Sequence, residues 1–179
     1  MAFYGCSTDP GNFNPDDCNF RNGRLRSGAL IKASLFATNP DFTSLAVWNT
    51  GVATGDIILL GNISGSYAEP AATEIDGTGD SDTITTSFAH EITFMHNGYV
   101  EDFYDFWNTM NTNREFHFAA RVDGLSENPI HYITTKPCAF IMSPPVEAGI
   151  DTQVVWKGKA KWKAVDMPIM RDVPAGLWT

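Results

Sequence analysis

The chain has 179 residues, of which 43% are apolar and 18% charged, which is typical of one globular domain and excludes a disordered chain. It contains no run of about 18 apolar residues, so a membrane-spanning helix and a membrane partner are not expected, and its start lacks a signal-peptide pattern. A net charge of −9 argues against a domain whose main task is to bind nucleic acid. We expect the three cysteines, Cys6, Cys18 and Cys138, to be reduced thiols.

The charges are unevenly distributed along the chain. Residues 33–113 contain eleven acidic residues and no lysine or arginine. Residues 114–179 contain eight basic and seven acidic residues. This asymmetry suggests that different surfaces of the protein carry opposite charge.

The first half of the chain reads as an irregular arm followed by β structure. Residues 1–23 contain several glycines and prolines among Asn and Asp, which predicts an arm without regular structure. Alternating apolar residues predict a strand over 29–36, and β-prone runs cover 45–54 and 56–67. Within 61–82, the stretch from Glu69 to Asp82 is acidic and poor in large apolar residues, which predicts a long exposed loop or a hairpin tip.

The second half contains the clearest elements. Strict alternation predicts a long strand over 83–96, and apolar residues three and four positions apart then predict an amphipathic helix over 99–110. Further strands are expected at the ranges 115–122, 130–135 with 139–142, and 152–165. A C-terminal arm, 167–179, follows. We therefore predict a single, mainly β domain spanning 1–179: a β-sandwich or partly open β-barrel with one flanking helix and extended terminal arms.

Motifs for catalysis or metal binding are weak. Three acidic residues within the predicted loop resemble oxygen ligands for calcium, but their spacing does not fit an EF-hand, and a solvated loop is the simpler interpretation: Asp76, Asp80 and Asp82. His90 and His96 share a strand face but lie roughly 20 Å apart along it, too far to bind one zinc ion. No nucleophile or phosphate-loop motif occurs, so we assign no catalytic residue and no cofactor.

The predicted last strand carries lysine at every second position, from Lys157 to Lys163. Lysines can protect an edge strand from aggregation. Alternatively, the row faces an acidic surface, such as the acidic loop of a second copy. On the second interpretation the assembly interface consists of Lys157, Lys159, Lys161, Lys163, Glu74, Asp76, Asp80 and Asp82.

The order of elements from residue 83 onward, a long strand, one amphipathic helix and strands ending in a Trp- and Lys-rich strand, resembles the tail tube proteins of bacteriophages and related injection machines. The resemblance covers residues 83–166 as an order of elements. It implies a non-enzymatic virion protein, assembled in the host cytoplasm, that forms hexameric rings from copies of itself, stacks them into a tube, and contacts DNA only as passing cargo. It assigns the flanking helix to 99–110, the stacking loop to 61–82, and further contacts to the terminal arms or other virion proteins.

Other functions remain open at this point. Another virion ring, adaptor or decoration protein would fit the same features. A β-sandwich binding module for carbohydrate or protein would use exposed tryptophans as stacking platforms, with Trp48, Trp156 and Trp178 as candidates. An unrecognised β-rich enzyme would need a pocket where histidines and carboxylates converge.

Overall fold

The computed structural model describes residues 24–76, 83–97, 101–123, 129–144 and 155–178. The predicted N-terminal arm, 1–23, and the centre of the acidic loop, 77–82, lie outside the described residues. Among the described helices, none has the length and apolar character needed to span a membrane.

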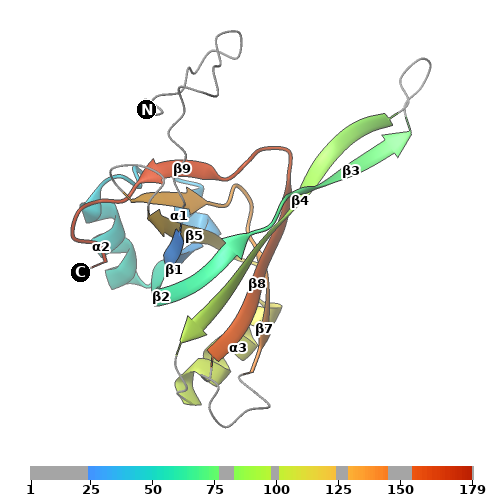
Figure 1. The fold of residues 1–179 in the computed structure, drawn as a ribbon. Helices are drawn as coiled ribbons and strands as arrows, with labels where there is room; N and C mark the ends of the chain where they lie inside the picture. Colours follow the sequence, from blue (N-terminus) through green and yellow to red (C-terminus); the bar gives the residue numbers. More distant parts are fainter. Residues whose placement is uncertain (1–23, 77–82, 98–100, 124–128, 145–154, 179) are drawn as a thin grey trace.

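In the described part of the chain, nine strands form one antiparallel sheet with the order β7-β8-β4-β2-β1-β5-β6-β9, and β3 pairs with the far end of β4 (Figure 1). The strands are β1 (Arg24–Lys32), β2 (Ile57–Tyr67), β3 (Ala71–Asp76), β4 (Thr83–Asn97), β5 (Phe116–Asp123), β6 (Ile130–Ile133), β7 (Ala139–Ser143), β8 (Val155–Ala164) and β9 (Ile169–Asp172).

The sheet bends, so that its two halves share one core. The half formed by β7, β8, β4 and β2 contributes Phe94, whose ring stacks on Phe118 of β5 with the centroids 5.1 Å apart. Helix α3 (Glu101–Thr112) packs on β7 and inserts the fully buried Trp107 against Phe94. The sheet does not close into a barrel. These features confirm the predicted mainly β, partly open architecture with a flanking helix.

Strand β2 connects the two halves by changing partners along its length. Its first part, up to Asn62, pairs with β1, and its second part, Ile63–Tyr67, pairs with β4. Gly65 allows the close approach to β4, because a Cβ atom there would lie 2.1 Å from the carbonyl oxygen of Thr93. The two halves are therefore parts of one continuous sheet rather than two separate sheets.

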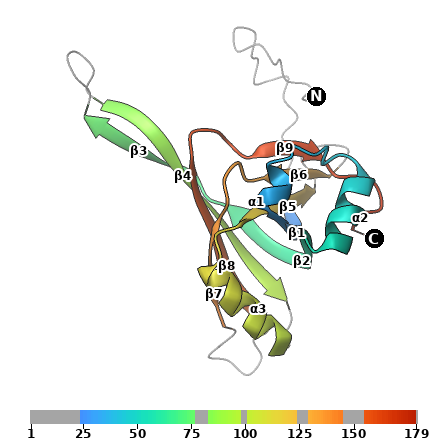
Figure 2. The same ribbon diagram turned by 180° about the vertical axis from the view of Figure 1, so that it is seen from behind.

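The outer face of the second half, β1-β5-β6, is covered by helices α1 (Ala33–Phe36) and α2 (Leu45–Thr54) and by the C-terminal residues (Figure 2). The fully buried Trp48 of α2 packs on this face beside His131 and donates a hydrogen bond from Nε1 to the carbonyl oxygen of Phe42. A second buried cluster therefore lies on the opposite side of these strands from the shared core.

The sequence predictions for 33–36 and 45–54 were wrong, because both segments are helical. The run at 45–54 contains β-prone Val and Trp residues, but Trp48 and Gly51 are buried on one side at helical spacing. Gly55, with φ of 76°, ends the helix in a left-handed conformation that glycine adopts without strain. Burial against the sheet outweighs the local β propensity here.

Most other elements were predicted within a few residues. Helix α3 extends two residues past its predicted end, to Thr112, and the predicted positions 99 and 100 lie outside the described residues. The segment predicted as one interrupted strand, 130–142, forms two strands far apart in the sheet: β7 is the strand at one end, and β6 lies next to β9, the strand at the other end. The predicted C-terminal arm is bound more closely than expected, because β9 pairs with β6 and Leu177 is buried on the body.

Candidate assembly interface

The lysine row lies on the outward face of β8. Lys157, Lys159 and Lys163 are exposed and Lys161 is half-buried, whereas the intervening side chains, from Trp156 to Ala164, point into the core and are buried. Alternation of lysines with apolar residues therefore predicted the two faces of this strand correctly.

The edge-strand interpretation was wrong, because β8 lies inside the sheet. It pairs with β4 over its whole length, from Val155 to Ala164, and with β7 from Lys157 to Lys161. Lysine protection is needed where a strand has an unpaired edge. The row therefore marks an exposed face of the sheet and not its border.

One carboxylate on the neighbouring strand binds the centre of the row. Glu91 of β4 accepts contacts from Lys159 and Lys161, with each Nζ 2.9 Å from one carboxylate oxygen. The hydrogen bonds from Lys159 and then Lys161 lower the pKa of Glu91. Glu91 is the only acidic residue among the stretches of β4, β7 and β8 that pair with one another, so this face keeps an excess of positive charge.

Apolar side chains accompany the lysines on the same face. Met95 pairs across the sheet with Lys157 and is 41% exposed, and Ile141 pairs with Lys159 and is 50% exposed. A shallow groove of about 550 Å³ runs here between β2, β4, β7 and β8, with Ser66 and Thr93 at its other wall. A face that combines charge with exposed apolar surface is typical of a protein contact more than of a purely solvated surface.

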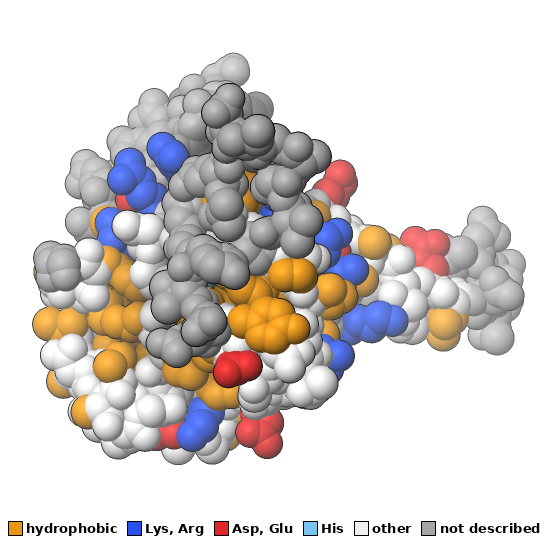
Figure 3. Space-filling view, turned by 90° about the horizontal axis from the view of Figure 1, so that it is seen from below, with side chains coloured by type: hydrophobic (Ala, Val, Ile, Leu, Met, Phe, Trp, Pro, Cys, Tyr) orange, Lys and Arg blue, Asp and Glu red, His pale blue; other side chains and the backbone are white. Residues whose placement is uncertain are grey.

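The acidic half of the predicted interface lies on a projecting hairpin. Strands β3 and β4 extend away from the body (Figure 1). Glu74 of β3 is exposed and pairs with Thr85 of β4. The lysine row ends at Lys163, which pairs with Ala89 of β4, so Glu74 lies further out along the hairpin than the last lysine. Figure 3 shows basic side chains gathered at the base of this projection and acidic ones further along it. Asp76 ends β3, and Asp80 and Asp82 lie outside the described residues.

The structure therefore places Glu74, the acidic residue of the predicted interface whose side chain is described, away from the lysine row of its own chain. Lys159 and Lys161 form ion pairs with Glu91, and among the described residues no ion pair joins Lys159, Lys161 or Lys163 to Glu74. The pairing of Glu74 with Thr85 places it four residues along β4 from Ala89, the residue that pairs with Lys163.

Within the described ranges, no group of three or more His, Cys, Asp or Glu side chains is arranged to bind a metal ion. Two of the three calcium candidates, Asp80 and Asp82, fall outside those ranges, so the calcium interpretation remains a prediction.

All four histidines are buried among aromatic rings. His90 stacks on Trp162 with the centroids 4.9 Å apart, and His117 stacks on Phe36 at 3.9 Å. His96 packs on Phe103 and Trp107, and His131 lies beside Trp48. Burial lowers the pKa of His96 and His117, and lowers that of His131 to about 3. All four side chains are core residues, and the lowered pKa values make His96, His117 and His131 neutral at pH 7.

The tryptophans proposed as carbohydrate platforms are not open to a ligand in this structure. Trp48 is fully buried and Trp156 is 3% exposed. Trp178 is half-buried and donates a hydrogen bond from Nε1 to His131 Nε2 at 3.0 Å. Stacking a sugar ring needs an exposed aromatic face, so this arrangement disfavours that function.

The buried Cys138 is equally inaccessible, and burial raises its pKa to about 12.

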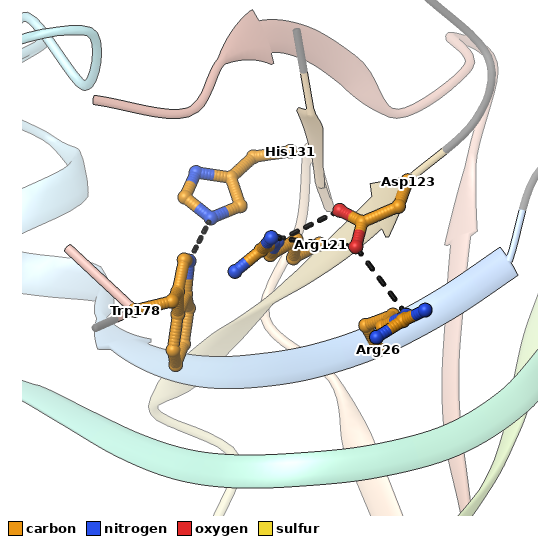
Figure 4. Close-up of polar contacts among 5 residues, drawn as sticks. All are labelled: Arg26, Arg121, Asp123, His131 and Trp178. Atoms are coloured by element: carbon orange, nitrogen blue, oxygen red, sulfur yellow. Dashed lines mark hydrogen bonds and ion pairs between the residues drawn. The ribbon is translucent and has the colours of Figure 1, made fainter. Parts of the chain in front are cut away.

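Sequence reasoning missed a polar cluster that borders this C-terminal contact (Figure 4). Arg121 donates to both carboxylate oxygens of Asp123, at 2.8 and 3.3 Å, and Arg26 lies 3.5 Å from the same carboxylate. These residues come from β5 and β1, and His131 pairs with Arg121 from β6. Arg121 and Asp123 are two residues apart on β5, and strand pairing brings Arg26 and His131 beside them.

Comparisons with protein-family models, with curated proteins and with solved structures found no match for this chain.

Proposed function

We propose that this protein is a non-enzymatic structural subunit that assembles with copies of itself into rings, as a tail tube protein of a phage virion does. The observation that carries the proposal is the charge arrangement on one face of the β7-β8-β4-β3 region. Lysines lie at the base of the projecting hairpin, and Glu74 lies further along it. Each subunit thus offers both partners of an intermolecular contact that it does not make within itself.

The shape of the molecule supports the same proposal. A hairpin that leaves the body can reach a neighbouring copy, and the exposed Met95 and Ile141 beside the lysines provide apolar surface for a contact. Contact between one patch and a different patch of the next copy is a head-to-tail interface, which gives a ring when the rotation closes. Stacking such rings would form the tube that the family resemblance implies.

The first experiment is to measure the mass of the purified protein in solution as a function of concentration and salt, with negative-stain imaging of the same samples. We expect multimers that weaken as the ionic strength rises, because exposed charges are screened over about 8 Å at physiological salt. Stacked tubes would support the tail tube assignment, and single rings would support an adaptor. A monomer at every concentration would contradict the proposal.

Charge reversal at Lys163 tests the interface itself. Lys163 ends the row nearest the hairpin and is exposed, whereas Lys159 and Lys161 also bind Glu91 and would confound the result. We expect Lys163→Glu to reduce assembly strongly with little change in thermal unfolding. The exposed Lys136, which precedes β7, provides the matched control as Lys136→Glu. Partial rescue of Lys163→Glu by Glu74→Lys would identify the acidic partner. Equal assembly by the Lys163 and Lys136 variants would place the contact elsewhere.

A further inference from the structure

A cavity of about 610 Å³ lies between the two halves of the sheet, beside the connection from β8 to β9. The half with β2 and β4 contributes Tyr67 and Ile92 to its lining. The half with β1, β5 and β6 contributes Val122 and Tyr132. Met167 belongs to the connection and is 62% exposed, which places it where the cavity meets solvent. The cavity therefore borders the shared core and opens at the surface.

The lining of the cavity is uncharged. Among the described residues it consists of apolar side chains, one glycine, one serine and two tyrosines. A charged ligand would lose its hydration there without meeting an opposite charge, which is costly. A mostly apolar pocket of about 300–1,000 Å³ with a few polar groups is typical of a small-molecule site. The lining therefore suits a small molecule without charge.

Two tyrosines supply the polar groups of the cavity. The Tyr67 hydroxyl hydrogen-bonds to Nδ1 of His90 at 2.5 Å, and whichever atom donates, the tyrosine oxygen keeps a lone pair for a ligand hydroxyl. His90 is 2% exposed and stacks on Trp162, so it holds the Tyr67 hydroxyl in place. The pKa of Tyr67 is raised by burial first and by Tyr132 second, and burial also raises the pKa of Tyr132. Both phenols are therefore neutral at pH 7 and can bond to an uncharged hydroxyl.

The remaining side chains favour an aromatic ligand over an alkyl chain. Met167 and Met170 line the cavity together with the two tyrosine rings. Thioether sulfurs and aromatic rings both make favourable contacts with an aromatic ring, and methionine adapts its shape to the molecule that it contacts.

We propose that this cavity binds an uncharged aromatic alcohol, with its ring against the methionines and its hydroxyl toward Tyr67 and Tyr132. The lysines of β8 are not part of the lining, so the site is separate from the proposed assembly interface. A bound ligand would contact both halves of the sheet and hold them together.

Titration of the full-length protein with 2-naphthol tests the proposal, by calorimetry and by thermal unfolding. We expect saturable binding and a melting temperature that rises with the ligand concentration, because the ligand binds the folded state. 1-Decanol carries a hydroxyl but no ring, and it should bind about tenfold more weakly. Absence of 2-naphthol binding would overturn the proposal, since the cavity would then not be open to a ligand. Binding of 1-decanol as tight as that of 2-naphthol would overturn the aromatic preference on which it depends.

A bulky residue at the mouth of the cavity tests where the ligand binds. Met167→Trp should weaken 2-naphthol binding by about tenfold, because the larger side chain obstructs the entrance. Val165→Trp is the matched control, since Val165 is 68% exposed, lies two residues earlier and is outside the lining. It should bind 2-naphthol as the wild type does.

Removal of one hydroxyl tests the polar contact separately. Tyr132→Phe should weaken 2-naphthol binding by about fivefold, because one hydrogen bond is lost, and should leave binding of 2-methylnaphthalene unchanged. Tyr104→Phe, at an exposed tyrosine of α3, is the control and should change neither affinity. Wild-type affinity for 2-naphthol in either Met167→Trp or Tyr132→Phe would overturn the proposed site.

Discussion

The two halves of the sheet differ in how many of their faces are covered. In the half built on β1 and β5, the central residues from Ala29 to Ile31 and from Phe116 to Ala120 are buried regardless of side, because the shared core covers one face and the helices α1 and α2 cover the other. In the half built on β8, buried and exposed residues alternate, and within the described ranges no helix covers the lysine face, which we call the bare face. The first half is packed on both faces, and the exposed face of the second half is the one that we propose for assembly.

The largest expected difference between the halves comes from core truncation. Trp48→Ala in the doubly covered half should lower the free energy of unfolding by about 3–5 kcal/mol, because a fully buried side chain and its hydrogen bond to Phe42 are lost. Lys163→Ala on the bare face should change it by less than about 0.5 kcal/mol. Chemical denaturation measures both values, and similar losses would contradict the comparison.

The second-largest effect is expected from acid, which should destabilise the doubly covered half. The folded-state pKa of His131 is lowered to about 3 from 6.5 by burial first and by Arg121 second, so between these values the unfolded state binds more protons. Stability therefore falls as the pH drops below about 6.5, by about 2 kcal/mol at pH 5 from this residue alone. Burial also lowers the pKa of His117, which adds in the same direction.

The pH range distinguishes the histidines from the carboxylates. The pKa values of Glu91 and Asp56 are lowered by hydrogen bonds from their partners, so their stabilising effect is present above their unfolded values and is lost only as the pH falls below about 4.5. Unfolding curves recorded between pH 7 and pH 5 should thus report the histidines. A stability that stays flat over this range would contradict the expected burial of His131 and His117.

An intermediate effect is expected at the border of the bare half. Asn111 of α3 binds the backbone of Met142 in β7 through both groups, with Oδ1 accepting from the amide at 2.7 Å and Nδ2 donating to the carbonyl at 3.4 Å. Asn111→Ala should cost about 1–2 kcal/mol, because two backbone groups lose their partners. It should also promote aggregation by exposing the edge of β7. Light scattering on heating should show the change, with Thr109→Ala as an exposed control on the same helix.

The smallest effect is expected from the carboxylate of the bare face. Glu91→Gln removes the negative charge and so the ion pairs with Lys159 and Lys161, but exposed ion pairs contribute only about 0–1 kcal/mol. The variant should lose a few tenths of a kcal/mol at low salt and nothing measurable at high salt. A loss as large as that of Trp48→Ala would mean that this face is not free for a partner.

The sequence predicted which side of a strand is exposed more reliably than which strands lie next to it. Alternation along β8 identified its outward lysines, but it carries no information on which strands lie beside it, and so the edge interpretation failed. The same limit explains why 130–142 was read as one strand, although Pro137 lies where the chain crosses from one end of the sheet to the other.

Helix α2 and the His131 contacts show a second limit. The local composition of 45–54 favours a strand, and only burial of Trp48 on the sheet makes it a helix. The hydrogen bond from Trp178 to His131 joins residues with no sequence relationship, through the placement of the C-terminal residues. Both features arise from tertiary packing, which residue spacing does not record.

The position of β8 in the sheet also has a consequence for synthesis of the protein. β4 is made early, but its long pairing with β8 forms only after α3, β5, β6 and β7 have been translated. Until then, one side of β4 has no strand beside it, and the apolar Ile92 and Phe94 lack part of their cover. Pairing between strands so distant in sequence is slow. A chaperone that holds nascent β4 until β8 has been translated should therefore raise the yield of soluble protein more than changes to the finished surface.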